Sequence, residues 1–562
     1  MTPTDRNNPC FYQLGKFLLI LIMQSFWKSG SAYIWLTGMT TGIGLLMIGG
    51  LIVLILMNGL GIFWPAPLEE LTLKDGSKVL GEIWNRERIP EASSNTPASR
   101  IRIKIGNRDF YGLDFRWIDE ADITARRLPD SAFVFERLAW GNFFGYATEL
   151  ALSGEIVAQG AKPTAAALPK PLREAARFVK EIKHLEQEVI GDINYEIEQR
   201  RLAIRGLGLR QNVGTEATTE IQRLEKEIVA LQEAYDQNEK QLEILREKGN
   251  AYQLTIQTID GRSKTLPLLE IVRAFQPNQM SRLEKTRLYF SRTGEFFASE
   301  PREANMEGGV FPAIFGTVMM VLIMSIAVVP LGVLTAIYMR EYAKQGPFVR
   351  TLRIAVNNLA GVPSIVFGIF GLGFFVYAVG GSIDKLFYPE ALPSPTFGTG
   401  GILWAALTLA LLTVPVVIVT TEEGLAAVPR AMREASLALG ATKFETLWRV
   451  LIPSASPAIL TGLILAMARA AGEVAPLMIT GVVKLAPSLP LDEHFPYLHL
   501  ERKFMHLGFH IYDVGFQSPN VEASLPMVYA TTLLLILIVL ALNLTAILLR
   551  NRLRQRFAAG QF

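Results

Sequence analysis

Cysteine is almost absent from this chain, because Cys10 is the only one among its 562 residues. A single cysteine excludes an intrachain disulfide framework and a zinc site built from several cysteines. The sequence also lacks the motif G-x-x-x-x-G-K-[ST], whose loop cradles nucleotide phosphates. No serine–histidine–acid or paired-carboxylate arrangement stands out either. We therefore expect a protein that is not an enzyme by itself and does not hydrolyse ATP.

Net charge is small as well, at +3 from 55 basic and 52 acidic residues. A charge so close to balance gives no reason to expect a nucleic acid partner. Hydrophobic residues make up 50% of the chain, yet 19% of its residues are charged. That mixture fits neither a pure membrane bundle nor a soluble protein, so we expect membrane spans combined with one sizeable polar domain.

Long apolar runs supply the membrane part. A bilayer core about 30 Å thick needs roughly 20 apolar residues in a helix. A shorter run at Phe11–Phe26 contains Lys16 and is more typical of a helix lying at the membrane interface, although a seventh span stays open. The six runs long enough to span are Leu36–Trp64, Val310–Met339, Ile354–Val379, Gly401–Thr420, Ala458–Val483 and Pro526–Leu549.

Lysine and arginine predict the orientation, because they gather in the short cytoplasmic loops of membrane proteins. They are frequent after the second span, in the 433–453 loop and in the C-terminal tail, whereas the loop between the third and fourth spans has only Lys385. This alternation places the long segment after the first span outside the cytoplasm. The predicted parts are a cytoplasmic or interfacial segment 1–35, a first span 36–64, an extracytoplasmic insert 65–309, a five-helix core 310–550 and a basic cytoplasmic tail 551–562.

The insert changes its pattern along its length. Its flanks, 68–123 and 252–275, alternate like β-strands. Between them, 172–249 carries apolar residues at alternating spacings of three and four, which predicts an antiparallel coiled-coil hairpin that protrudes from a β-rich domain. Leu73–Ile83 and Ile259–Ile271 share a strand, an Asp-Gly turn and a second strand, which suggests an internal repeat.

Two ionisable residues, Arg469 and Glu473, lie inside the fifth apolar run, in the sequence R-A-A-G-E-V-A-P. Charges in hydrocarbon cost about 2.5–3.5 kcal/mol on insertion scales, so these side chains should face a pathway or a partner. Four residues apart, they share one helix face near the expected membrane middle. We favour a transport pathway, in which Arg469 contacts an anion, over a structural ion pair between helices.

The loop Arg433–Pro453 is amphipathic and charged although it lies between two apolar runs. Its pattern predicts two short helices broken near Gly440, with apolar side chains offered to a partner outside the membrane. The loop resembles the E-A-A-x3-G-x9-I-x-L-P element through which permeases of ABC importers dock on their ATPase, with Ser436 replacing the third motif residue. The resemblance implies ATPase coupling by Glu434, Ala435, Gly440, Phe444, Leu447, Trp448 and Pro453.

The Arg469–Glu473 run, with T-T-E-E-G at 420–424 and N-N-L-A-G-V-P-S-I-V-F-G at 357–368, is similar to the PstA permease family of bacterial phosphate importers. That resemblance implies a six-helix type I permease in the cell inner membrane, with Arg469 and Glu473 in the phosphate path. It also implies a homologous second permease, an ATPase dimer that holds ATP and magnesium, and an extracytoplasmic phosphate-binding protein as partners. No cofactor is expected on this chain. The insert matches a long form of the family, for which the resemblance supplies no function.

Two alternatives remain open at this point. The same architecture could carry another oxyanion, such as phosphonate or molybdate. The chain could instead be an envelope scaffold or sensor that acts through the coiled coil. For several other polar residues we favour a structural role over a functional one. Asn357, Asn358 and Ser364 should satisfy a broken helix start, and Glu422 and Glu423 should be solvated acids. The loop histidines His494, His499, His506 and His510 are not expected to form a metal site.

Overall fold

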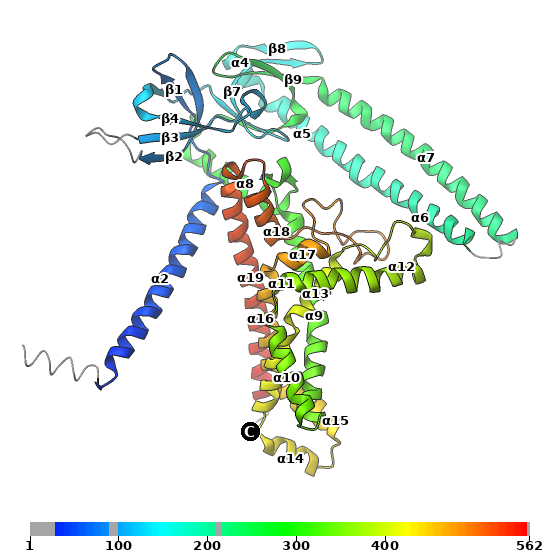
Figure 1. Ribbon diagram of the computed structural model, residues 1–562. Helices are drawn as coiled ribbons and strands as arrows, with labels where there is room; N and C mark the ends of the chain where they lie inside the picture. The colour runs from blue at the N-terminus through cyan, green and yellow to red at the C-terminus, as the bar shows by residue number, and fades with distance from the viewer. Residues whose placement is uncertain (1–27, 89–98, 210–214, 559–562) are drawn as a thin grey trace, which may run out of the picture.

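The computed structural model describes residues 28–88, 99–209 and 215–558, so the apolar run Phe11–Phe26 lies outside the described residues. In the described chain, six helices are long and apolar enough to cross a membrane, which confirms the predicted number and order (Figure 1). Two of them differ from the prediction in where they begin or break. The six are Ser31–Gly61, Phe311–Tyr342, Ser364–Phe387, Ile402–Ala427, Lys443–Gly472 and Val521–Arg552.

The third predicted span, Ile354–Val379, is wrong at its start. Helix α10 (Pro347–Leu359) is a separate helix that carries two arginines. The chain breaks before Pro363, and α11 (Ser364–Phe370) then leads through a π-helical stretch into α12 (Gly381–Phe387). Proline explains the break, because it lacks an amide hydrogen and keeps the preceding residue out of the helical region. The broken helix start expected near Ser364 is therefore present, although the sequence pattern includes the apolar residues at the end of α10 in the span.

The fifth predicted span, Ala458–Val483, is wrong at both ends. One continuous helical segment joins α15 (Lys443–Thr446), a π-helical turn and α16 (Ile452–Gly472). It ends at Glu473, which has an extended backbone with φ −75° and ψ 139°. A short helix, α17 (Ala475–Thr480), follows with proline in its first turn, where the missing amide hydrogen costs little. Glu473 therefore lies at a helix break and not inside a helix.

Helix α13 (Ile402–Ala427) is the centre of the bundle and packs against α9 (Phe311–Ile337) and α16. Small residues permit the close contact with α16. A Cβ on Gly462 would lie 2.0 Å from the Thr420 hydroxyl and 3.4 Å from the backbone of Val417. Because α13 and α16 run antiparallel, Arg469, two turns beyond Gly462, lies level with the middle of α13.

The insert contains two β-sheets of the same plan. The first has the strand order β4-β3-β2-β1-β5 and the second the order β10-β9-β7-β6-β11, with β8 paired to β7. In each sheet the first strand pairs with both the second and the last. The strands are β1 Glu69–Leu73, β2 Lys78–Arg88, β3 Ser99–Lys104, β4 Phe115–Asp119, β5 Ile123–Arg127, β6 Phe133–Arg137, β7 Phe143–Leu152, β8 Glu155–Gln159, β9 Tyr252–Gln257, β10 Ser263–Pro267 and β11 Ile271–Phe275.

This plan corrects the register of the predicted repeat. Leu73–Ile83 forms the turn between β1 and β2, whereas Ile259–Ile271 follows β9 and includes β10, so the two stretches occupy different places in their sheets. The structural repeat pairs β1–β5 with β6–β11. In both copies a 3-10 turn, Glu120–Asp122 or Leu268–Glu270, precedes the last strand. Residues 133–159, between the two predicted flanks, supply three strands of the second copy.

A helical hairpin is inserted into the second sheet copy, between β8 and β9. Its first arm is α5 (Pro169–His184), a π-helical turn and α6 (Ile190–Gly208), and its second arm is α7 (Thr215–Asn250). The arms lie side by side (Figure 1) and bury Leu185, Ile190 and Leu242 between them. Helix α6 continues through Gly206.

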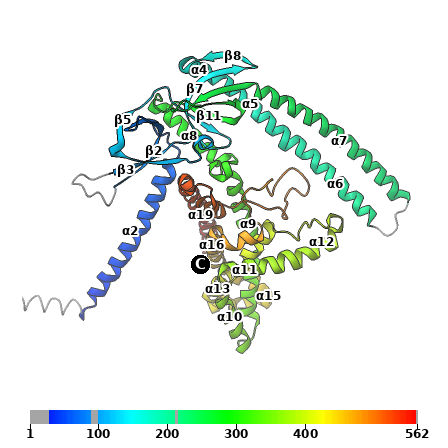
Figure 2. The ribbon, with the colours of Figure 1, turned by 45° about the horizontal axis from the view of Figure 1, so that its top comes forward.

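The hairpin extends sideways from the insert, and α6 lies above α12 in both views (Figures 1 and 2). The Tyr195 hydroxyl donates a hydrogen bond to the Phe495 carbonyl at 3.2 Å. The Tyr195 ring also lies 4.2 Å from the ring of His494, whose Nε2 is 3.5 Å from Asp192. These contacts join the hairpin to the loop that precedes the last span.

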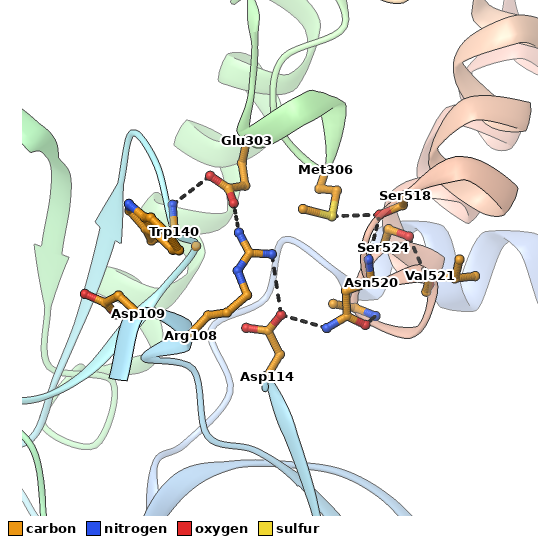
Figure 3. Close-up of polar contacts among 12 residues, drawn as sticks. Arg108, Asp109, Asp114, Trp140, Glu303, Met306, Ser518, Asn520, Val521 and Ser524 are labelled. Carbon is orange, nitrogen blue, oxygen red and sulfur yellow. Dashed lines mark hydrogen bonds and ion pairs between the residues drawn. The ribbon is translucent and has the colours of Figure 1, made fainter. Parts of the chain in front are cut away.

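A second junction joins the first sheet to the start of α19 (Val521–Ala558) (Figure 3). The Asn520 amide donates to Asp114 at 2.7 Å, and Arg102 pairs with Glu522 at 2.9 Å. Arg108 lies between Asp114 and Glu303 and forms an ion pair with each. Glu303, Ala304 and Asn305 all have positive φ, a conformation that side chains rarely adopt and that the surrounding contacts must hold.

Candidate functional site

The 433–453 loop forms a bent arm at the end of the bundle remote from the insert (Figure 1). Helix α14 (Arg430–Ala438) ends before Gly440, whose φ of +85° is the left-handed conformation that glycine adopts at helix ends. Thr442 then caps the next helix, exchanging hydrogen bonds with Glu445 in a capping box. The predicted break near Gly440 is therefore present in the structure.

The arm presents apolar side chains to its surroundings. Phe444 and Trp448 are exposed and stack with ring centroids 6.3 Å apart. Leu439, which sequence reasoning did not select, is 90% exposed at the bend. Leu447 was predicted to face a partner, but it is only 6% exposed and packs in the cluster of Leu425 and Leu451. Its helical position allows this, since neighbouring residues point about 100° apart around a helix, so Leu447 can face the bundle while Trp448 stays exposed.

Charged contacts tie the arm to the end of the second span. Arg433 forms an ion pair with Glu341 at 2.8 Å, and Lys443 donates to the Glu341 carbonyl at 3.3 Å. Ser436 and Thr446 join the two limbs of the arm through their hydroxyls at 2.9 Å. Glu341 gave no signal in the sequence because 92 residues separate it from Arg433. The arm is therefore connected to the end of α9 by side-chain contacts and to α16 by the chain itself.

Arg469 and Glu473 meet at the break of the fifth span. The Arg469 Nε lies 3.5 Å from Glu473 Oε1, at the long limit for a hydrogen bond, and the side chains are 36% and 20% exposed. Among the described residues, Arg469 has no other hydrogen bond or ion pair. One loose partner leaves most of the five guanidinium donors open. An anion could bind there without displacing a tight ion pair.

A second broken helix packs beside this site. A Cβ on Gly368 in α11 would lie 2.7 Å from the backbone of Pro476 in α17. Phe367 belongs to the same buried cluster as Ala470 and Ala471. Each helix follows a break, one at Pro363 and the other at Glu473. In many secondary transporters, interrupted helices that meet inside the membrane form the substrate site.

Other predicted residues lie apart from this break. Asn357 and Asn358 are exposed near the end of α10, and Ser364 starts α11, as expected for a broken helix. Glu422 is not a free solvated acid, because Arg353 donates to it from α10 at 2.9 Å. Glu423 is exposed.

The four loop histidines also have separate surroundings. His499 lies between Asp492 at 2.9 Å and Glu501 at 3.1 Å, and His494 faces the hairpin. Burial lowers the pKa of His506 to about 3 and that of His510 to about 4, so both are neutral at pH 7. In the part of the chain that the structure describes, no three histidine, cysteine or acidic side chains form a metal-binding group.

Comparison with known proteins identifies related chains. Residues 328–559 match the family model described as binding-protein-dependent transport system inner membrane component, and this match begins after the insert. The chain is 39% identical over 172 residues to the phosphate transport system permease protein PstA of Mycobacterium leprae, covering 31% of this chain and 51% of that protein. It thus spans about half the length of that relative.

Two other relatives are covered more fully. The chain is 32% identical over 259 residues to the probable ABC transporter permease protein YqgI of Bacillus subtilis, covering 45% of this chain and 81% of the relative. It is 34% identical over 243 residues to phosphate transport system permease protein PstA 1 of Mycobacterium tuberculosis, covering 43% of this chain and 71% of the relative.

Proposed function

The chain belongs to the PstA family of ABC-transporter permeases, and from that premise we propose that it is a membrane subunit of an ATP-driven importer of inorganic phosphate. The observation that carries this proposal is the loosely paired Arg469 at the break of a membrane helix. Phosphate with one to two negative charges suits the planar fork of an arginine. Glu473 would orient Arg469 while the site is empty and release it when phosphate arrives.

Movement would reach this site through α15 and α16. The arm at 433–453 and the break at Glu473 lie at opposite ends of one helical segment, Lys443–Gly472. An ATPase that pushes on Leu439, Phe444 and Trp448 would displace the whole segment. Because the Arg433–Glu341 ion pair also ties the arm to α9, both helices would move together. This rocking would alternate access to the Arg469 site between the two sides of the membrane.

The proposed assembly has the arm in the cytoplasm and the insert outside it. Its partners would be a homologous second permease, two ATPase subunits that hold ATP and magnesium, and an extracytoplasmic phosphate-binding protein. The basic residues beside the arm, including Arg430 and Arg449, support this sidedness. We place the insert, with its coiled-coil hairpin, on the face that receives the binding protein.

An envelope scaffold or sensor is the second candidate for the insert. The heptad spacing of α7 favours it, since such a seam can bind another chain. The contact of Tyr195 with Phe495 favours a role within the transporter instead, because it ties α6 to the bundle. Excising 172–249 separates the two: a transporter role predicts impaired uptake or complex assembly, whereas a scaffold role alone predicts that both survive.

Uptake of labelled phosphate into vesicles containing the assembled transporter tests the phosphate path. Arg469→Ala should lower uptake roughly 10- to 100-fold, since hydrogen bonds to charged groups contribute about 1.5–3 kcal/mol. Arg469→Lys should recover part of the loss. The matched control is Arg201→Ala, which removes an exposed arginine on the hairpin and should leave uptake unchanged. Unchanged uptake by both Arg469→Ala and Glu473→Ala would remove the pair from the path.

Competition identifies the anion. A phosphate importer should continue to take up labelled phosphate in the presence of excess molybdate or phosphonate. Strong inhibition by one of these anions, accompanied by its own ATP-dependent uptake, would reassign the cargo.

A further inference from the structure

A cavity of about 490 Å³ opens where the insert meets the ends of the first and last spans. One wall is apolar and comes from the membrane helices, with Met57 of α2, Trp64 just after it and Leu525 of α19, all three exposed. The opposite wall comes from β2, β3 and the 301–308 segment and is charged. Tryptophan at the end of a span is typical of the membrane–water interface. The cavity therefore lies at the level of lipid headgroups.

Several charges in this cavity neutralise one another. Glu136 accepts hydrogen bonds from Arg273, at 2.6 Å, and from Arg292. Arg302 pairs with Glu295 at 2.7 Å. Burial opposes the charge on Glu136, but the two arginines outweigh it and keep the pKa of that carboxyl below its usual value. These groups form a closed network and need no ligand.

Three other charged residues of the cavity are left over: Glu82, Lys104 and Glu307. Among the described residues, the side chains of these three have no hydrogen bond or ion pair, although their backbones pair in strands. Glu82 and Lys104 are opposite each other on the antiparallel strands β2 and β3, where side chains start about 5 Å apart. They nevertheless do not pair, and the Lys104 ammonium lies 5.7 Å from the centre of the Trp84 ring. Burial raises the pKa of both glutamates, against the attraction of Lys104. The three side chains are partly buried, and unpaired charges that are partly withdrawn from water are costly unless something else satisfies them.

We propose that this cavity binds the headgroup of a zwitterionic membrane lipid that carries a primary amine. The lipid ammonium lies at the Glu82 and Glu307 carboxylates, and the lipid phosphate lies at Lys104. Such a headgroup carries an ammonium and a phosphate joined by a two-carbon link, so one molecule can supply both charges to neighbouring groups on the paired strands β2 and β3. The acyl chains follow the exposed apolar face of α2, which begins at the same cavity.

The chemistry of the free groups selects an amine headgroup. A carboxylate accepts hydrogen bonds, which a primary ammonium can donate and a quaternary ammonium cannot. A purely anionic headgroup would meet Lys104 but would also face two glutamates. The neighbouring cavity beside Arg108 and Trp140 offers no similar site, because Arg108, Asp114, Glu303 and Asn520 already pair with one another (Figure 3).

The test is lipid retention by the full chain. The protein is reconstituted into nanodiscs of phosphatidylcholine mixed equally with phosphatidylethanolamine, extracted in mild detergent, and its bound lipid is measured by native mass spectrometry. We expect phosphatidylethanolamine to be retained at least fivefold over phosphatidylcholine. The double variant Glu82→Gln/Glu307→Gln should lose this preference, whereas Glu155→Gln, an exposed acid on β8, should keep it.

Lys104→Gln supplies an independent variant in case the double variant fails to fold. It should lower total phospholipid retention. Equal retention of the two lipids by the unmodified chain, an undiminished preference in a folded double variant, or a preference for phosphatidylglycerol in a parallel arm would each overturn the proposal. Retention does not depend on phosphate uptake, so the outcome is separate from that of the transport experiment.

Discussion

Asn520 donates a hydrogen bond to Asp114 at 2.7 Å, although the two residues are 406 positions apart in the chain. The contact joins the first sheet of the insert to the residue that precedes α19 (Figure 3). The Arg102–Glu522 ion pair lies two residues further along the chain, in the first turn of α19. The insert is therefore attached to the first span, α2, by the chain itself and to the last span, α19, by these side-chain contacts. Motion of the last span must be transmitted to the sheets or must break these contacts.

We expect Asp114→Ala to loosen this junction. The substitution leaves the Asn520 amide without its acceptor and removes one of the two partners of Arg108, which should cost about 1–3 kcal/mol. Hydrogen exchange measured by mass spectrometry should show faster exchange at 107–115 and 518–524 than in the unmodified chain. Asp130→Ala, which removes an exposed acid, is the control. Equal exchange in the two variants would show that Asp114 does not hold the junction.

Local patterns predicted much of the membrane part. Runs of about 20 apolar residues give the spans directly, and the bend at Gly440 follows from glycine and the adjacent Thr442–Glu445 capping pattern. The positions of the breaks were harder to predict. The sequence indicated a broken helix start near Ser364, but the apolar residues on both sides of Pro363 hid where α10 ends. Glu473 and Val474 form no turn signal. The break at Glu473 lies beside a close helix contact, that of Gly368 with Pro476.

In the insert too, the sequence predicted the local elements but not their arrangement. Alternation predicted strands in its flanks, but strand order depends on pairing between distant residues, which no short pattern records. The hairpin 169–250 separates β8 from β9 and hid the repeat of β1–β5 in β6–β11. Heptad spacing predicted the long helices of the hairpin, although both arms are longer than expected. It could not predict that α6 rests on the loop at Phe495, because that contact uses a tyrosine hydroxyl and not the apolar seam.

Gly440→Ala should disturb the bend of the arm. The space around the glycine is open, so the cost comes from the backbone: a φ of +85° costs roughly 1–2 kcal/mol for a residue with a side chain. ATPase activity of the assembled transporter, measured with and without binding protein, should become less dependent on the binding protein. Gly440→Asn should be milder, because asparagine tolerates this conformation. Gly38→Ala, in an open position of α2, controls for a general effect of replacing glycine. Unaltered coupling in Gly440→Ala would show that the bend is not required.

Leu447 and Trp448 are neighbours in sequence but should respond oppositely to alanine substitution. Trp448 is 62% exposed, so its loss should weaken copurification of the ATPase subunit and leave thermal unfolding of the chain unchanged. Leu447 is buried, so Leu447→Ala should destabilise the chain by about 2–5 kcal/mol. ATPase binding by both alanine variants is measured by quantitative pull-down, and their stability by thermal unfolding in the same detergent. A stable Leu447→Ala variant that fails to bind the ATPase would restore Leu447 as a contact residue.

Glu82 and Glu307 should give the free energy of unfolding of the chain an unusual pH dependence when no amine lipid is present. Burial raises the pKa of both carboxyls, although Lys104, Arg292 and Arg302 attract their charges and Glu136 and Asp114 repel them. A carboxyl whose pKa is raised by folding binds more protons in the folded state than in the unfolded state. Its contribution to the free energy of unfolding is therefore fully present below the ordinary pKa and is lost as pH rises through the raised pKa.

Glutamine at both positions removes that loss, because it stays neutral at every pH. In phosphatidylcholine nanodiscs at pH 7, Glu82→Gln/Glu307→Gln should therefore unfold at a higher Tm than the unmodified chain, by about 2–4 °C for each kcal/mol relieved. The difference should shrink towards about pH 4, where the glutamates are protonated. Glu155→Gln should show no such pH-dependent difference. Adding phosphatidylethanolamine should raise the Tm of the unmodified chain at pH 7 and leave the double variant unchanged, since only ionised carboxylates gain from the ammonium. A Tm difference that is constant with pH would contradict the assignment of unpaired, buried charge to these two residues.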